Sequence, residues 1–100
     1  MRFGLKDKKV ENIIMVLSRY KDVKRAVIFG SRASGDFKYN SDIDIAVYTE
    51  NGLPTGLYLD LDEAAGIYKI DVVDMNTLQN EKLRQKIELQ GIEFYVAYFT

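Results

Sequence analysis

The sequence predicts an α/β fold in which a small mixed sheet of three or four strands carries helices packed on one face. Short apolar runs rich in β-branched residues, each ending near Gly, Asn or Asp, recur along the chain. The segments between them have apolar residues at helical spacing. One hundred residues suffice for one small core and not for two. We therefore expect a single domain spanning residues 1–100.

The first helix and strand are clear from their periodicity. In residues 7–20 the apolar positions recur every three or four residues, which is typical of an amphipathic helix. Residues 24–29 form an apolar run that ends at Gly30, and this pattern predicts a strand.

A turn and a second strand follow Gly30. Residues 31–34 are expected to form a short helical turn whose N-terminus faces a ligand, and residues 35–41 read as loop. In residues 43–48, apolar side chains alternate with Asp42, Asp44 and Ala46, a pattern that predicts a half-buried strand. Because side chains alternate across a strand, Asp42 and Asp44 would project from the same face with Cα atoms roughly 7 Å apart.

The second half of the chain repeats this alternation. The spacing predicts a helix over 55–66, a strand over 70–75, and a helix over 78–89 capped by Asn76 and Thr77. The acidic face of the first of these helices is interpreted as solvated rather than as a metal site. The aromatic tail, residues 92–99, is either a last strand or, if exposed, a partner surface.

The residue types that are missing exclude several functions. The chain has no Cys and no His, so it has no disulfide, no thiol nucleophile and no imidazole base. A net charge of −1 argues against nonspecific binding to nucleic acid. No apolar run approaches the length of a membrane span and the N-terminus lacks a signal-peptide core, so we expect a cytoplasmic protein.

The strand–turn–strand centred on Gly30 carries the chemistry. Gly30 and Ser31 offer backbone N–H groups and a hydroxyl to a phosphate, although a plain turn glycine is the simpler alternative. Asp42 and Asp44 would repel one another unless a cation such as Mg²⁺ bound between them, the alternative being the wet face of a strand. An EF-hand and a Walker P-loop are excluded by the residues at their fixed positions. The combination predicts a site for a nucleoside triphosphate and its Mg²⁺ ion.

This stretch also resembles a known family. Gly30-Ser31, ten residues and then Asp42-Ile43-Asp44 are similar to the signature of the polymerase-β-like nucleotidyltransferases. Within that superfamily, Gly-Ser-Arg-Ala-x-Gly-Asp and Ser-Asp-Ile-Asp-Ile-Ala-Val resemble the minimal nucleotidyltransferases (MNT) that pair with HEPN proteins in toxin–antitoxin modules. Ser34 stands where many relatives have a second Arg, which removes one phosphate contact that the family implies.

The resemblance implies roles for further residues. From the residues alone Asp71 and Asp74 cannot be ranked, and the resemblance selects Asp71 as the third carboxylate. Asp42, Asp44 and Asp71 would then be both catalytic and metal-binding, with a two-ion Mg²⁺ site and Asp71 activating the acceptor hydroxyl. Gly30, Ser31 and Arg32 would bind the triphosphate of ATP, although Arg32 has a simpler alternative role in a surface pair with Asp36. A solvated Lys38 is favoured over a phosphate ligand.

Three functions are consistent with these features. The first, implied by the resemblance, is an antitoxin that transfers AMP from ATP to a tyrosine near the active site of a HEPN ribonuclease toxin. The second is an antitoxin that blocks its partner by binding alone. The third is a nucleotidyltransferase acting on a small molecule. The sequence gives neither the acceptor nor the oligomeric state.

Overall fold

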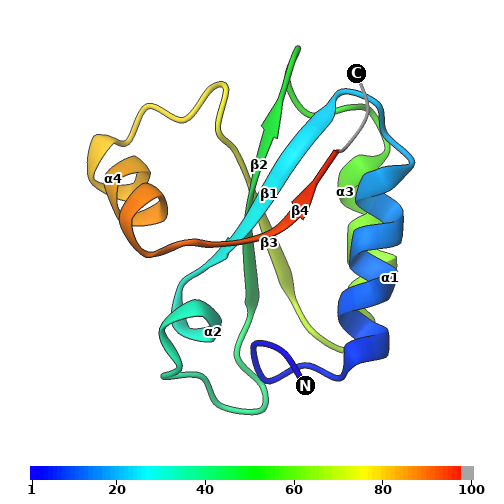
Figure 1. Cartoon of the computed structure of the whole chain (residues 1–100), viewed down its shortest axis with the longest axis vertical. Coiled ribbons are helices and arrows are strands. Elements are labelled where there is room, and N and C mark those ends of the chain that lie inside the picture. The colour runs from blue at the N-terminus through cyan, green and yellow to red at the C-terminus, as the bar shows by residue number, and fades with distance from the viewer. Residues whose placement is uncertain (98–100) are drawn as a thin grey trace.

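Four strands form one mixed sheet in the order β3-β2-β1-β4 (Figure 1). In this computed structural model residues 1–97 are described. Strand β1 pairs antiparallel with β2 and with β4, whereas β2 and β3 run parallel. The elements are α1 (Asp7–Ser18), β1 (Val23–Phe29), α2 (Ser31–Ser34), β2 (Ile43–Thr49), α3 (Leu57–Ala65), β3 (Ile70–Asp74), α4 (Glu81–Gln90) and β4 (Ile92–Val96).

Helices α1 and α3 lie side by side on one face of the sheet (Figure 1). Their apolar stripes meet the inward side chains of the central strands in the larger of two cores. This core is formed by buried aliphatic residues, among them Ile13, Leu17, Ile28, Ile45 and Leu61. The predicted amphipathic helices are thus found where the periodicity placed them.

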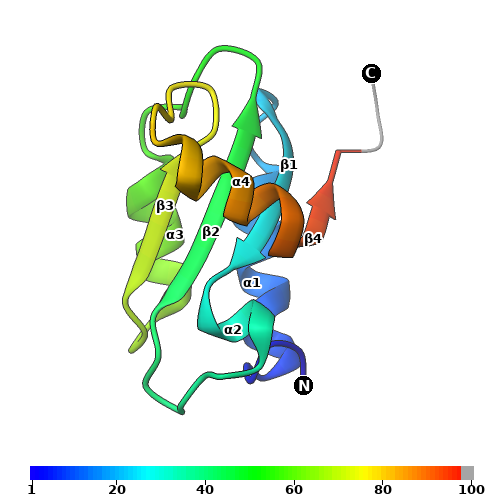
Figure 2. The same cartoon turned by 90° about the vertical axis from the view of Figure 1, so that its left-hand side faces the viewer.

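Helix α4 packs on the opposite face, so the expectation that all helices share one face is wrong for this element (Figures 1 and 2). Its buried Ile87 joins a second, smaller core with Val27, Phe29 and Ala46. These strand residues alternate with those of the larger core, so both faces of β1 and β2 are apolar and both must be covered. The long apolar run in the sequence fits this two-sided burial better than a half-buried strand.

Two predicted boundaries shift for local reasons. Helix α4 begins at Glu81 rather than near residue 78, because the side chain of Asn80 accepts a hydrogen bond from the Leu83 N–H and caps the helix. The tail forms a strand over Ile92–Val96, as one of the two predictions had it, and Phe94 and Tyr95 pack against the larger core. Residues 98 and 99, which were included in that prediction, lie outside the described residues.

The helices of residues 1–97 are short, the longest being α1 with 12 residues. Within this range, no helix combines the length and the apolar character that crossing a bilayer requires.

Candidate active site

Two carboxylates lie opposite one another on neighbouring strands. In the parallel pair β2–β3, Asp44 is in register with Asp71, and two residues further along Ala46 is in register with Val73. Because alternate residues share a face, Asp44 and Asp71 lie on the α4 side of the sheet. Helix α4 covers the sheet at the Ala46–Val73 pair, and the two aspartates, two residues earlier on their strands, remain only half-buried.

The environment of Asp44 disfavours its charge. Burial, a hydrogen bond with Asp71 and the negative charges of Asp71 and Asp42 together raise the pKa of Asp44 to about 6, while Lys69 opposes this shift. Without a cation, Asp44 therefore keeps its proton to a higher pH than an isolated carboxyl does. A divalent cation would relieve the repulsion that a proton otherwise relieves.

Gly30 meets Asp44 at close range. Phe29, the last residue of β1, is paired with Asp44, and Gly30 follows with a φ of 73°. A Cβ added at Gly30 would lie 2.5 Å from Oδ2 of Asp44. The sequence predicted that Gly30 allows a phosphate to approach the backbone. In the structure, its missing side chain also leaves room for the carboxylate of Asp44.

A cavity opens beside this turn. It has a volume of about 510 Å³ and is lined by residues from two distant parts of the chain: Gly30, Ser31, Ser34, Asp36, Lys86 and Gln90. Ser31 begins α2 and is half-buried, so its hydroxyl and the adjacent backbone border this space. Helix α4 lies above α2 on the same side of the sheet (Figures 1 and 2). The predicted phosphate-binding residues Gly30 and Ser31 thus border a cavity, and Gly30 also approaches Asp44.

Asp42 is positioned less directly than the sequence suggested. It precedes β2, which begins at Ile43, and so does not share a strand with Asp44. It is half-buried and close enough to contribute to the raised pKa of Asp44. In residues 1–97 no three acidic side chains are already arranged as a metal-binding group. The structure therefore assembles the Asp44–Asp71 pair, and Asp42 would have to approach it to complete a three-carboxylate site.

The donor set nevertheless fits Mg²⁺. The side chains available are all carboxylates, which are the hard oxygen ligands that this ion prefers, and Mg²⁺ commonly takes only one or two of them together with phosphate oxygens. Asp44 and Asp71 would supply that pair.

Arg32 occupies a different place from the one predicted. Its side chain is 2% exposed, and its guanidinium donates hydrogen bonds to the main-chain carbonyls of Phe3 (3.0 Å), Ser41 (2.8 Å) and Tyr39 (3.4 Å). The surface pair with Asp36 is absent from the salt bridges of residues 1–97. The observed contacts tie the loop before Asp42 to the N-terminal segment, so Arg32 positions this loop, and its predicted contact with triphosphate has no support from this geometry.

The structure also places two further residues that the sequence pointed to, one in the loop after α2 and one at the end of β3. Lys38 is exposed, and its backbone N–H donates to the hydroxyl of Ser41 at 2.8 Å, which agrees with the interpretation of a solvated side chain. Asp74, which could not be ranked against Asp71, accepts a hydrogen bond from the Asn76 N–H at 2.9 Å and stabilises the turn after β3.

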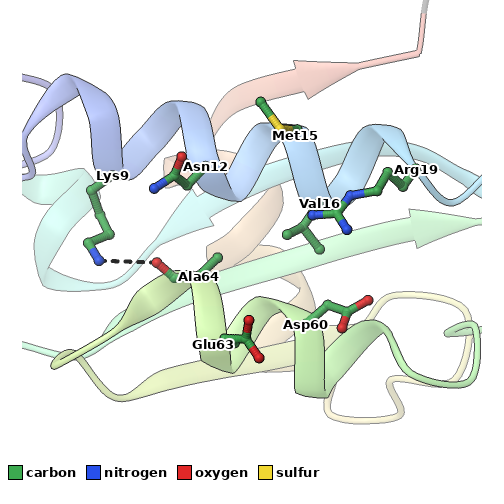
Figure 3. Close-up of a pocket in the computed structure, with 8 residues that line it drawn as sticks. All are labelled: Lys9, Asn12, Met15, Val16, Arg19, Asp60, Glu63 and Ala64. Atoms are coloured by element: carbon green, nitrogen blue, oxygen red, sulfur yellow. Dashed lines mark hydrogen bonds between the residues drawn. The ribbon is translucent and has the colours of Figure 1, made fainter.

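A second cavity, of about 340 Å³, lies between α1 and α3 on the other face of the sheet (Figure 3). Lys9 donates to the carbonyl of Ala64 at 3.1 Å across this groove, and the Tyr20 hydroxyl donates to Asp60, an interaction that raises the pKa of Tyr20. Asp60 and Glu63 come from the acidic face that the sequence left as solvated. Acidic and basic side chains from the two helices line this groove together, Lys9 and Arg19 among them, as in an ordinary helix–helix contact. The groove lies on the face of the sheet opposite the Asp44–Asp71 pair.

Sequence reasoning missed Lys86 and Gln90. Helical periodicity indicated that Ile87 faces inward, and Lys86 and Gln90 lie on the adjacent surface of α4 one turn apart. Nothing local shows that this surface is folded against the Gly30 turn, more than fifty residues earlier in the chain.

Comparisons with known proteins agree with this geometry. The family described as polymerase beta, nucleotidyltransferase matches residues 11–97. No protein of curated function matches the sequence significantly. A solved toxin–antitoxin with AMP-PNP is 30% identical with a TM-score of 0.71, and 87% of this chain aligns with 73% of that one.

Two further solved structures are similar. The toxin–antitoxin MntA–HepT is 25% identical with a TM-score of 0.70, over 92% of this chain and 74% of that one. A complex of a tri-AMPylated Shewanella oneidensis HEPN toxin with its MNT antitoxin is 24% identical with a TM-score of 0.68, over 89% and 71%, and shares the fold. The resemblance read from the Gly30–Asp44 motif is thereby confirmed, and the chain belongs to the polymerase-β nucleotidyltransferase family.

Proposed function

We propose that this protein is a Mg²⁺-dependent nucleotidyltransferase that transfers AMP from ATP to a tyrosine hydroxyl of a HEPN ribonuclease toxin and so neutralises it. The observation that carries the proposal is the Asp44–Asp71 pair, which lies next to the Gly30–Ser31 turn and its cavity. A carboxylate pair near a cavity large enough for a triphosphate suits nucleotidyl transfer, in which metal-bound carboxylates and phosphate positioning dominate.

The partner and the nucleotide are supported by the comparisons. The 30% identical relative is a toxin–antitoxin with AMP-PNP, an analogue of ATP, and the MntA–HepT structure is also a toxin–antitoxin. A toxin partner and an adenine nucleotide are thus the simplest assignment for this chain.

The residues would act as follows. Asp44 and Asp71, with Asp42 approaching, would hold Mg²⁺, which when bound neutralises phosphate charge and polarises the α-phosphorus. Gly30 N–H and the Ser31 N–H and hydroxyl would hold the β- and γ-phosphates. The acceptor hydroxyl would lose its proton to Asp71 as its oxygen forms a bond to the α-phosphorus, the α–β anhydride bond breaks, and pyrophosphate leaves with the bonding electrons.

The test is the intact mass of a HEPN toxin incubated with ATP, Mg²⁺ and this protein. Wild type should add one or more AMP groups to the toxin, Asp44→Asn should add none, and Asp74→Asn should behave as wild type because Asp74 serves the turn. Peptide mapping would then identify the tyrosine.

Two other outcomes have definite meanings. If the toxin keeps its mass but co-purifies with this protein and is inhibited, the protein neutralises by binding alone. If the toxin is neither modified nor bound, transfer to a small molecule becomes the function to pursue.

A further inference from the structure

We propose that Lys86 binds the β- and γ-phosphates of the nucleotide from the α4 side of the cavity. This inference rests on the proposed function and adds a residue that determines preference for a triphosphate. It begins from the cavity beside Gly30, in which Lys86 is the only Lys or Arg among the lining residues of the described chain.

The cavity is placed for the triphosphate tail. It is bordered by Gly30, whose absent Cβ would contact Asp44, so Gly30 separates the cavity from that carboxylate, which does not itself line it. With Mg²⁺ at Asp44 and Asp71, the reacting α-phosphate would lie near the aspartates and the β- and γ-phosphates would extend towards Ser31 and Lys86. A volume of about 510 Å³ accommodates such a group, since ligand pockets typically measure about 300–1,000 Å³.

Charge on this side of the site is otherwise unfavourable to a nucleotide. Asp36 lines the cavity, and its carboxylate accepts a hydrogen bond from the Ser34 hydroxyl at 3.1 Å. Arg32 donates to main-chain carbonyls and is buried. Lys69 lies near Asp44 but does not line this space. A triphosphate therefore needs a cation here, and Lys86 supplies it.

Lys86 is also uncommitted. Within residues 1–97 it takes part in no salt bridge, whereas its neighbour Arg84 donates to the carbonyls of Met75 and Leu78. An exposed ammonium beside a cavity, with no carboxylate within bridging distance, is free to bind an anion.

Helix α4 holds Lys86 in place. Ile87, the next residue, is 1% exposed and packs on β1 and β2. A Cβ at Gly91 would lie 3.2 Å from Cγ2 of Val27, so the end of the helix closely approaches the sheet. The Asn80 cap and the Arg84 hydrogen bonds fix its other end. Lys82 lies one turn before Lys86 on the same surface of the helix but does not line the cavity, which makes it a matched control.

The experiment is calorimetric titration with α,β-methylene-ATP, whose α–β bond cannot be cleaved, and with AMP, both in Mg²⁺. The proteins are wild type, Lys86→Gln, Lys86→Arg and Lys82→Gln. Because a charge-assisted hydrogen bond is removed, Lys86→Gln should bind the triphosphate analogue about 10- to 100-fold more weakly and AMP within about twofold of wild type. Lys86→Arg should retain most of the affinity, and Lys82→Gln all of it.

The outcomes separate this inference from the proposed function. Wild-type affinity of Lys86→Gln for the analogue would overturn the role of Lys86 and leave nucleotide transfer intact. Equal weakening of the analogue and of AMP would also overturn it, since the loss would not act through the β- and γ-phosphates. If wild type binds neither nucleotide, both proposals fail.

Discussion

Asp44 and Asp71 are partners across the parallel strands β2 and β3, and burial together with this pairing raises the pKa of Asp44 to about 6. An acidic group whose pKa is higher in the folded state than in the unfolded chain stabilises the fold most at low pH. That stabilisation is lost as pH rises from the ordinary value of 3.8 to about 6. The metal-free protein therefore carries an electrostatic cost at neutral pH.

Asp44→Asn should relieve this cost. In the absence of divalent cations, we expect the variant to be more stable than wild type at pH 7.5 by on the order of 1 kcal/mol, a figure reduced for the partial exposure of the site. At pH 3.5 the difference should nearly vanish, because the wild-type carboxyl is then mostly protonated in both states. Thermal unfolding at the two pH values measures this, and a variant less stable than wild type at pH 7.5 would contradict it.

Asp71→Asn should abolish transfer of AMP, because it removes a metal ligand and the acceptor of the hydroxyl proton. We expect a loss of at least about 100-fold, the size found when one group that stabilises a transition state is removed. The assay is incorporation of α-labelled ATP into the toxin. Asp74→Asn, three residues later on the same strand, is the control, and equal losses in both variants would show that Asp71 has no special role.

Gly30→Ala should disturb both the fold and the site. The new Cβ would contact Oδ2 of Asp44 at 2.5 Å, and alanine is strained at a φ of 73°, so we expect a loss of roughly 2–4 kcal/mol in stability. Gly35→Ala is the comparison, because Gly35 also has a positive φ, of 92°, but lies in the left-handed region that alanine tolerates better and has no atom within 4 Å of the added Cβ. It should cost only about 1 kcal/mol. Urea unfolding of both variants measures the difference, and equal costs would show that contact with Asp44 is unimportant.

Arg32→Gln should destabilise the protein without any nucleotide present. The buried guanidinium satisfies the carbonyls of Phe3, Tyr39 and Ser41, and shortening the side chain leaves these groups unpaired, at a cost of roughly 2–4 kcal/mol. Lys38→Gln, in the exposed part of the same loop, should change stability by less than about 0.5 kcal/mol. A stable Arg32→Gln protein that has lost only nucleotide affinity would restore the role predicted from the sequence.

The sequence by itself determined the features that depend on neighbouring residues. Alternation in residues 43–48 specifies a strand, and the glycine at position 30 specifies a sharp turn at the end of β1. The motif from Gly30 to Asp44 identifies the family, because its chemistry is built from residues less than fifteen positions apart. The helices α1, α3 and α4 follow from apolar spacing, to within a few residues at each end.

Only the tertiary structure decided which distant residues meet. The register between β2 and β3 pairs Asp44 with Asp71, whereas the residues alone could not rank Asp71 above Asp74. Packing of α4 on the second face brings Lys86 to the Gly30 turn, and folding of the N-terminal segment buries Arg32, whose charge had suggested a phosphate ligand. Local patterns determine how a segment folds, whereas long-range contacts determine which other segments it touches. At this site, those long-range contacts decide which cation is available to a bound phosphate.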